Sequence, residues 1–135
     1  SHCNVDGVEL DKERAMAIHS KQIYSKIYMA DYLMWDATRK YDLIIGNPPY
    51  KLAEEFIKHS RNFLDTNSKL VFLLRLNFLE GQRRRKTLWD HYKPEKILVC
   101  SKRISFSGNG KTDATAYGVY VWGKESAATT TMEWL

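Results

Sequence analysis

The tetrapeptide Asn47-Pro48-Pro49-Tyr50 contains the residue types of a chemically active slot. The two prolines lock the backbone and lack an N–H, so the Pro48 carbonyl and the Asn47 side-chain amide become fixed polar groups. Tyr50 adds a flat aromatic ring beside them. Two acceptors next to an aromatic face suit a planar group that carries an NH2. The alternative is a rigid turn whose tyrosine packs on the core.

The segment before this tetrapeptide determines where it lies. Residues Tyr41–Gly46 have the continuous apolar centre, Leu43 to Ile45, that is typical of a strand covered on both faces. Prolines cannot donate to a sheet ladder, so the strand must end at Asn47. In an open α/β sheet, ligands bind beyond the carboxyl ends of the strands. The sequence therefore predicts a functional site at Asn47–Tyr50.

The rest of the chain alternates short apolar runs with helical patterns, which indicates an α/β sheet. The last two expected strands are joined by a loop rich in Gly, Ser and Asn, which predicts an antiparallel hairpin near the C-terminus. A polar patch at Asp65–Ser68 predicts a turn. The expected strands are Val5–Asp11, Lys26–Ala30, Leu70–Leu74, Lys96–Cys100 and Ala116–Trp122, and the expected helices are 12–22, 52–63 and 82–92.

Length and composition limit the class of protein. The 135 residues suit one domain, and 44% hydrophobic with 27% charged residues excludes a disordered chain. No apolar run reaches the ~20 residues of a membrane span, and no charged-then-apolar leader opens the chain, so we expect a cytoplasmic protein. Cys3 and Cys100 are too few for a disulfide scaffold, and no metal site is expected. The net charge of +5 permits a nucleic-acid partner.

The segment Asp42–Tyr50 resembles the catalytic motif of S-adenosylmethionine-dependent amino-group methyltransferases. The resemblance is greatest to the N6-adenine DNA methyltransferases of bacteria and phages. It implies S-adenosylmethionine as cofactor, DNA as partner and Asn47, Pro48, Pro49 and Tyr50 as catalytic residues. Tyr50 would also bind substrate by stacking on an adenine that has left the duplex.

Other segments resemble the same family in the same order, over about residues 5–123. The resemblance implies that Glu9 holds the ribose hydroxyls of the cofactor and that Asp31 accepts from its adenine amine. Tyr32 and Asn47 complete the implied cofactor contacts. A late loop that resembles phage-type members implies substrate contacts from Arg103 and Lys111.

One part of the family pattern does not appear in this sequence. The first strand and its glycine-rich loop should precede Val5. The resemblance therefore implies a Rossmann-like methyltransferase sheet with helices on both faces and the first central strand missing. Residues 1–125 would form a partial catalytic domain, and residues 126–135 a loose C-terminal tail. We expect strands to re-pair across the gap, or another chain to fill it by self-association.

Several alternatives stay open at this level. The same tetrapeptide occurs in methyltransferases that act on RNA adenine or on a protein glutamine amide, since all present a planar NH2. A non-catalytic nucleic-acid-binding or interaction module derived from a methyltransferase is another reading. The basic run Arg83–Lys86 favours nucleic acid if it contacts phosphate, but it is equally well a solvated helix face. The phage-type resemblance also suggests a restriction–modification context.

Overall fold

The computed structural model describes residues 4–11, 13–14, 16–17, 26–36, 39–102 and 115–135. It divides the chain into two compact units, Ser1–Thr38 and Arg39–Leu135, which are described separately below. None of the helices in the described part has both the length and the apolar character that crossing a membrane requires. The expected boundary between a catalytic domain and a tail at residue 125 stays a prediction.

The first unit contains two parallel strands, β1 (Asp6–Glu9) and β2 (Lys26–Met29), in the two places where the sequence predicts strands. In their register Glu9 pairs with Met29, and the Ala30 N–H donates to the Glu9 carbonyl at 3.0 Å. A short 3-10 helix, η1 (Tyr32–Met34), follows β2. The described residues of the expected helix 12–22, which are 13, 14, 16 and 17, are helical.

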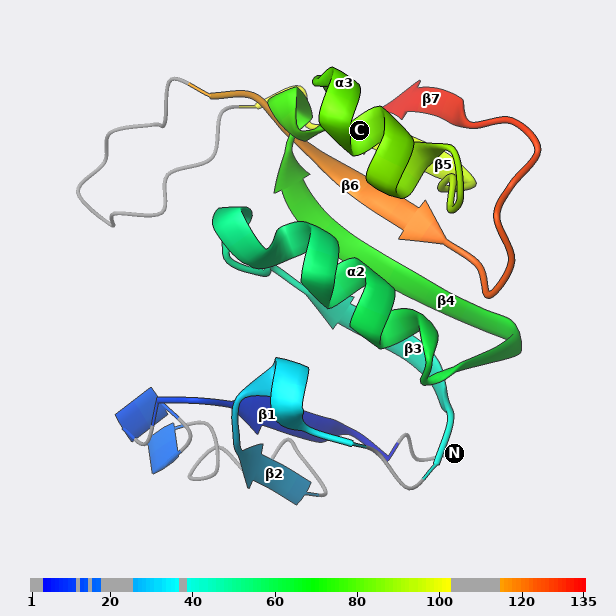
Figure 1. The fold of residues 1–135 in the computed structure, drawn as a ribbon. Coiled ribbons are helices and arrows are strands. Elements are labelled where there is room, and N and C mark those ends of the chain that lie inside the picture. The colour runs from blue at the N-terminus through cyan, green and yellow to red at the C-terminus, as the bar shows by residue number, and fades with distance from the viewer. Residues whose placement is uncertain (1–3, 12, 15, 18–25, 37–38, 103–114) are drawn as a thin grey trace. The chain divides into compact units, whose positions relative to one another are not determined.

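The second unit is a five-stranded mixed sheet in the order β3-β4-β6-β5-β7 (Figure 1). β3 is parallel to β4, β6 is antiparallel to both of its neighbours, and β7 is parallel to β5. The predicted antiparallel pairing of the last two expected strands is therefore confirmed. The strands are β3 (Tyr41–Gly46), β4 (Leu64–Arg75), β5 (Lys96–Val99), β6 (Tyr117–Trp122) and β7 (Thr131–Trp134).

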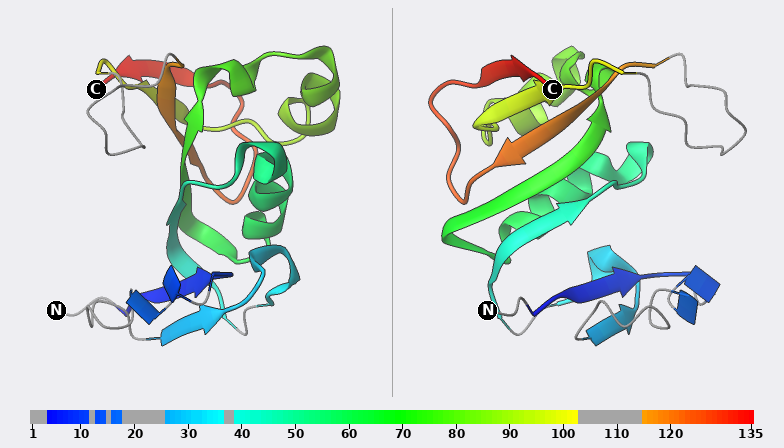
Figure 2. Two further views of the ribbon diagram at one scale, coloured as in Figure 1. Left: turned by 90° about the vertical axis from the view of Figure 1, so that its left-hand side faces the viewer. Right: turned by 180° about the vertical axis from the view of Figure 1, so that it is seen from behind.

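The described helices of this unit lie on one face of the sheet (Figure 2), whereas the sequence leads us to expect helices on both faces. They are η2 (Tyr50–Leu52), α2 (Ala53–Arg61), η3 (Leu76–Leu79), α3 (Gln82–Arg84) and the π-helical turn η4 (Arg85–Trp89). Alternate residues of β4, such as Leu70, Phe72 and Leu74, point into the core beneath them. Ile57 of α2 and Trp122 of β6 are fully buried there. Burial of this apolar layer places the start of α2 beside the carboxyl end of β3.

Two expectations about local structure are wrong. Asp65–Ser68 lies within the bounds of β4 and not between two elements, although the β3–β4 register shifts there and the Asp65 N–H donates to the Ser68 hydroxyl at 2.9 Å, as in a bulge. The loose tail is also wrong for Thr131–Trp134, which pair with β5 and complete the sheet as β7. Both segments are polar or short, and their conformation depends on strands that are distant in sequence.

The strand pairing divides the described strands into two sheets. The strands β1 and β2 form one sheet, and the other five form another. Among the described strands of the second unit β3 pairs only with β4, and the expected re-pairing across the gap stays a prediction. Filling by another chain stays a prediction.

Candidate active site

Asn47–Tyr50 lies at the carboxyl end of β3, as the sequence predicts. Pro48 is buried, whereas Asn47 and Pro49 are exposed. The Leu52 N–H donates to the Pro49 carbonyl at 3.0 Å and closes the 3-10 turn that leads into α2. No described residue hydrogen-bonds to the Asn47 side chain or to the Pro48 carbonyl. Among the described residues both acceptors are thus unused.

Tyr50 combines the two roles that the sequence left open. Its side chain packs edge-on against the buried ring of Phe78, with ring centroids 6.2 Å apart and an interplanar angle of 79°. The residue nevertheless keeps 37% of its surface exposed. The turn is thus anchored to the core through one part of the ring, while another part remains accessible for stacking.

Two arginines lie beside this tyrosine. The guanidinium carbon of Arg75, at the end of β4, is 5.2 Å from the Tyr50 ring centroid, and that of Arg84, in α3, is 5.9 Å away. The Tyr120 hydroxyl donates to the Arg75 carbonyl at 2.9 Å and fixes the backbone there. Arg75 is not among the residues predicted from the sequence, although it ends a strand beside β3, where side chains at the carboxyl end are candidates for a site.

A carboxylate on α2 balances part of this positive charge. The carboxylate of Glu54 lies 3.0 Å from the Lys58 ammonium and 3.7 Å from the Arg84 Nε. Burial raises the pKa of Glu54, but hydrogen bonding from Lys58 and the charges of Lys58 and Arg84 outweigh it and hold the pKa below its usual value. Glu54 therefore stays ionised beside Arg84.

Replacing Glu54 with glutamine is expected to remove a stabilisation that depends on pH. A carboxyl whose pKa is lower in the folded chain stabilises it above the unfolded-state pKa, about 4.5. This contribution is lost as the pH falls through the lowered folded-state pKa. Urea unfolding from pH 7 to pH 3 should show the largest difference from wild type at neutral pH and little at pH 3.

The exposed neighbour Glu55 provides the matched control, because Glu55→Gln also removes a carboxylate from the first turn of α2. A Glu54→Gln difference that stays constant down to pH 3 would contradict the assignment.

The predicted cofactor residues of the first unit lie at one edge of its parallel pair. Glu9 ends β1, and Asp31 follows β2 by two residues, so both are at carboxyl ends of neighbouring strands. Asp31 accepts from the Leu33 N–H at 3.1 Å and caps η1, and Glu9 lies 3.5 Å from the Arg14 guanidinium. The ring of Tyr32 stacks on Trp35 with centroids 6.0 Å apart. Their cofactor roles stay predictions.

Other predicted or candidate residues fall elsewhere. Arg103 and Lys111 lie outside the described residues. Within the described part of the chain, no group of three or more His, Cys, Asp or Glu side chains could hold a metal ion.

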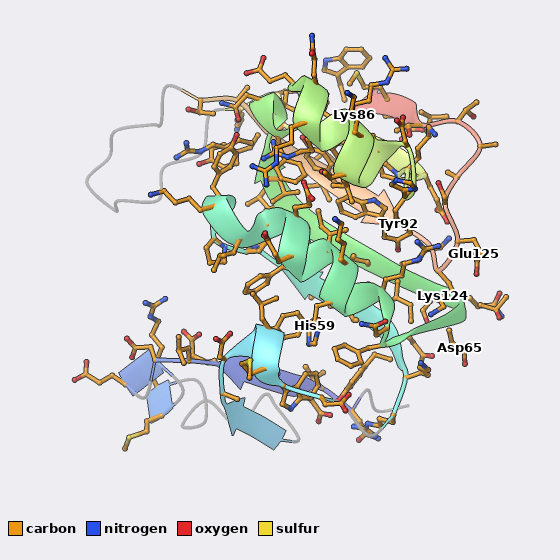
Figure 3. The ribbon with its side chains drawn as sticks, viewed as in Figure 1. His59, Asp65, Lys86, Tyr92, Lys124 and Glu125 are labelled. Atoms are coloured by element: carbon orange, nitrogen blue, oxygen red, sulfur yellow. The ribbon has the colours of Figure 1, made fainter. Side chains whose placement is uncertain are left out.

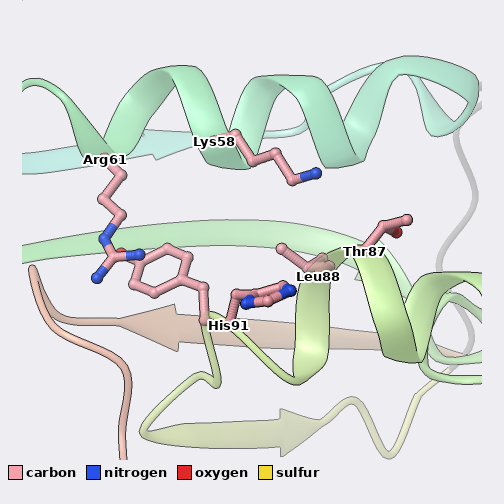
Figure 4. Close-up of a pocket in the computed structure, with 6 residues that line it drawn as sticks. Lys58, Arg61, Thr87, Leu88 and His91 are labelled. Carbon is pink, nitrogen blue, oxygen red and sulfur yellow. The ribbon is translucent and has the colours of Figure 1, made fainter.

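A hollow of about 360 Å³ lies between α2 and the α3–η4 segment, where Lys58 points toward the turn that carries Thr87 (Figure 4). None of the predicted site residues lines it; its lining residues are Lys58, Arg61, Thr87, Leu88, His91 and Tyr92.

The residues around this hollow also hold the unit together. Arg61 lies over the Tyr92 ring at 4.1 Å and donates from Nε to the Lys124 carbonyl at 2.8 Å. The Tyr92 hydroxyl donates to the Gly123 carbonyl, and Figure 3 shows Tyr92, Lys124 and Glu125 on the same side of the unit. Burial raises the pKa of Tyr92 far above its usual value, so the hydroxyl remains a donor. The contacts of Arg61 and Tyr92 therefore give these residues a structural role in the unit.

Comparison with known proteins identifies the fold of the chain. No family model matches the chain. A structure from Listeria monocytogenes, assigned to the class I S-adenosylmethionine-dependent methyltransferases, superposes with a TM-score of 0.71 at 13% identity, over 98% of this chain and 49% of that one. The chain has a methyltransferase fold. The expected Rossmann-like sheet is thereby confirmed.

Two further proteins are similar to this chain, the first in fold and the second in sequence. The N-methyltransferase NodS of Bradyrhizobium japonicum, in complex with S-adenosyl-L-homocysteine, superposes with a TM-score of 0.60 at 11% identity, over 88% of this chain and 65% of that one. The type II methyltransferase M.CvrRI of Paramecium bursaria Chlorella virus XZ-6E is 34% identical over 64 residues, which are 47% of this chain and 17% of the viral enzyme. The chain thus spans only part of the proteins that it matches.

Proposed function

We propose that the chain is part of an S-adenosylmethionine-dependent methyltransferase that modifies the exocyclic N6 amine of adenine in DNA. The observation that carries the proposal is the rigid Asn47–Tyr50 turn at the carboxyl end of β3, with its two acceptors unused by described residues. The similarity to a viral type II methyltransferase supports the same reaction class.

The residues of the turn suit the chemistry of an aromatic amine. The nitrogen of such an amine is a poor nucleophile because its lone pair is delocalised into the ring. Acceptance of its two hydrogens by the Asn47 side-chain oxygen and the Pro48 carbonyl would favour a tetrahedral nitrogen and direct the lone pair outward. Tyr50 would hold the base by stacking, and the extra proton would leave to solvent afterwards. Catalysis would rest on positioning and fixed dipoles.

The cofactor would supply an electrophilic methyl group on a sulfonium. Glu9 and Asp31 suit its nucleoside part, because carboxylates accept hydrogen bonds strongly from ribose hydroxyls and from an amine. Tyr32 offers an aromatic face next to Asp31, and Asn47 keeps the cofactor role that the family motif implies. The group of residues assigned to the cofactor is therefore Glu9, Asp31, Tyr32 and Asn47.

DNA is the proposed partner. Arg83, Arg85 and Lys86 are exposed on the α3–η4 segment, and Figure 3 labels Lys86 there. Exposed basic side chains contact phosphates without reading sequence, which suits either DNA or RNA. A methyltransferase of RNA adenine or of a protein glutamine amide, and a module that binds without catalysis, are the outcomes that would replace this proposal.

Calorimetric titration with S-adenosylmethionine tests the proposal. We expect micromolar binding to the full chain and a loss of about tenfold to a hundredfold in affinity for Asp31→Ala, the range expected for a charge-assisted hydrogen bond. Asp36→Ala, which removes a nearby exposed carboxylate, should bind as wild type does. Thermal unfolding of both variants separates the loss of the η1 cap from the loss of a ligand contact. No detectable heat with the wild-type chain would contradict the cofactor assignment.

A further inference from the structure

We propose that Arg84 is a positioning residue that fixes the ring of Tyr50 for base stacking and is not a phosphate contact. The inference rests on the proposed function, because it concerns the tyrosine of the same slot. It separates one arginine from a basic run whose four members look alike in the sequence.

Arg84 differs from its neighbours in the basic run because its side chain is less exposed. Arg83, Arg85 and Lys86 are exposed, and Arg85 lies 3.7 Å from the Asp90 carboxylate. The Arg84 side chain is only 25% exposed. Its Nε is buried and has no hydrogen-bond partner within the part of the chain that the structure describes. A guanidinium held in this way is poorly placed to follow a phosphate backbone.

The Arg84 guanidinium is held against a buried ring of the core. Its central carbon lies 4.0 Å from the Phe78 ring centroid, and Nη1 donates to the Phe78 carbonyl at 2.9 Å. Phe78 is fully buried and also contacts Trp89 and Tyr120 edge-on, with centroids 5.6 and 6.1 Å away. Arg84 is therefore attached to one of the most constrained side chains of the unit.

Arg84 also lies beside Tyr50 of the Asn47–Tyr50 turn. The same guanidinium reaches the Tyr50 ring, and Glu54 supplies a nearby negative charge that offsets its partial burial. A cation beside an aromatic face is attracted more strongly when it is partly desolvated. Arg84 thus links the Tyr50 ring to Phe78 of the core. Fixing the ring before the base arrives removes an ordering cost from binding.

A double-mutant cycle on base stacking tests the inference. The full chain is titrated with single-stranded DNA that contains 2-aminopurine, whose fluorescence falls when it stacks on an aromatic ring. We expect Arg84→Met to weaken this quenching interaction about threefold to thirtyfold, the range for a cation–π contact between exposed and desolvated limits. In a Tyr50→Ala background the quenching ring is gone, so affinity is measured by fluorescence anisotropy of the same oligonucleotide. Arg84→Met should have no further effect there, because its contribution acts through the ring.

Two controls separate positioning from charge and from folding. Arg83→Met removes the same charge from an exposed neighbour that is proposed to contact phosphate, so it should weaken binding by the same factor with and without the Tyr50 ring. Arg84→Lys keeps the cation and should recover part of the loss, and it replaces Arg84→Met if that variant unfolds. Losses for Arg83→Met and Arg84→Met that depend equally on the Tyr50 ring, or an undiminished Arg84→Met effect in the Tyr50→Ala background, would overturn the inference.

A second readout keeps the inference separate from the proposed function. If the wild-type chain does not quench the probe, the proposed substrate is wrong, and the ring of Tyr50 is then followed directly. Its aromatic NMR signals, assigned by comparison with Tyr50→Phe, should shift and broaden in Arg84→Met and remain unchanged in Arg83→Met. Unchanged signals in Arg84→Met would overturn the positioning role.

Discussion

Replacing Asn47 with alanine is expected to abolish methyl transfer to DNA adenine while leaving DNA binding within about twofold. The Asn47 side-chain oxygen is the acceptor that would orient the amine, and loss of one preorganised polar group of this kind lowers kcat by about 10²–10³-fold. Since the exposed basic run Arg83–Lys86 is untouched, the proposed phosphate contacts, which would dominate affinity, remain. Transfer of a labelled methyl group and fluorescence anisotropy with the same oligonucleotide measure the two quantities.

Asn67 offers a matched control for this experiment. It is exposed on β4, so Asn67→Ala removes the same side chain without touching the slot. Equal transfer rates for wild type and Asn47→Ala would contradict the catalytic assignment. A wild-type chain that binds DNA and shows no transfer under any condition would instead favour the non-catalytic module.

Replacing Trp122 with alanine is expected to destabilise the second unit by about 3–5 kcal/mol. This fully buried ring stacks against Trp89, Tyr92 and Tyr120, with centroids 6.5, 6.1 and 5.8 Å away. Its removal leaves a cavity between β6 and the η4 segment that rigid neighbours cannot fill. Urea unfolding followed by circular dichroism measures the loss in the free energy of unfolding.

Trp134 provides the control for Trp122. It lies on β7 with 71% of its surface exposed, so Trp134→Ala should change the free energy of unfolding by less than about 0.5 kcal/mol. Similar losses for the two variants would show that the aromatic cluster does not dominate this core. Trp122→Ala should also loosen the packing of Phe78 beneath Tyr50. Phe78 packs on Trp89 and Tyr120, which both contact Trp122.

The contrast between Asp31 and Arg84 shows how sequence and structure divide the functional assignments. The family order predicts Asp31 as a site residue after a strand, and the structure places it just beyond the carboxyl end of β2, where it also caps η1. Arg84 was grouped with three exposed neighbours, and only the tertiary structure separates it from them. A helix periodicity places residues on faces, but it does not say which ring or carboxylate that face will meet.

The sequence by itself determined the strand Tyr41–Gly46, the proline stop after it, the position of α2 and the pairing of β5 with β6. These features follow from local causes: a continuous apolar run, residues without an N–H, and a turn-rich connection between two strands. Only the tertiary structure decided that Asp65–Ser68 continues β4 and that Thr131–Trp134 add a strand. It also decided that Arg75, Phe78 and Arg84 surround Tyr50, because segments that are separate in the sequence meet at one edge of the sheet.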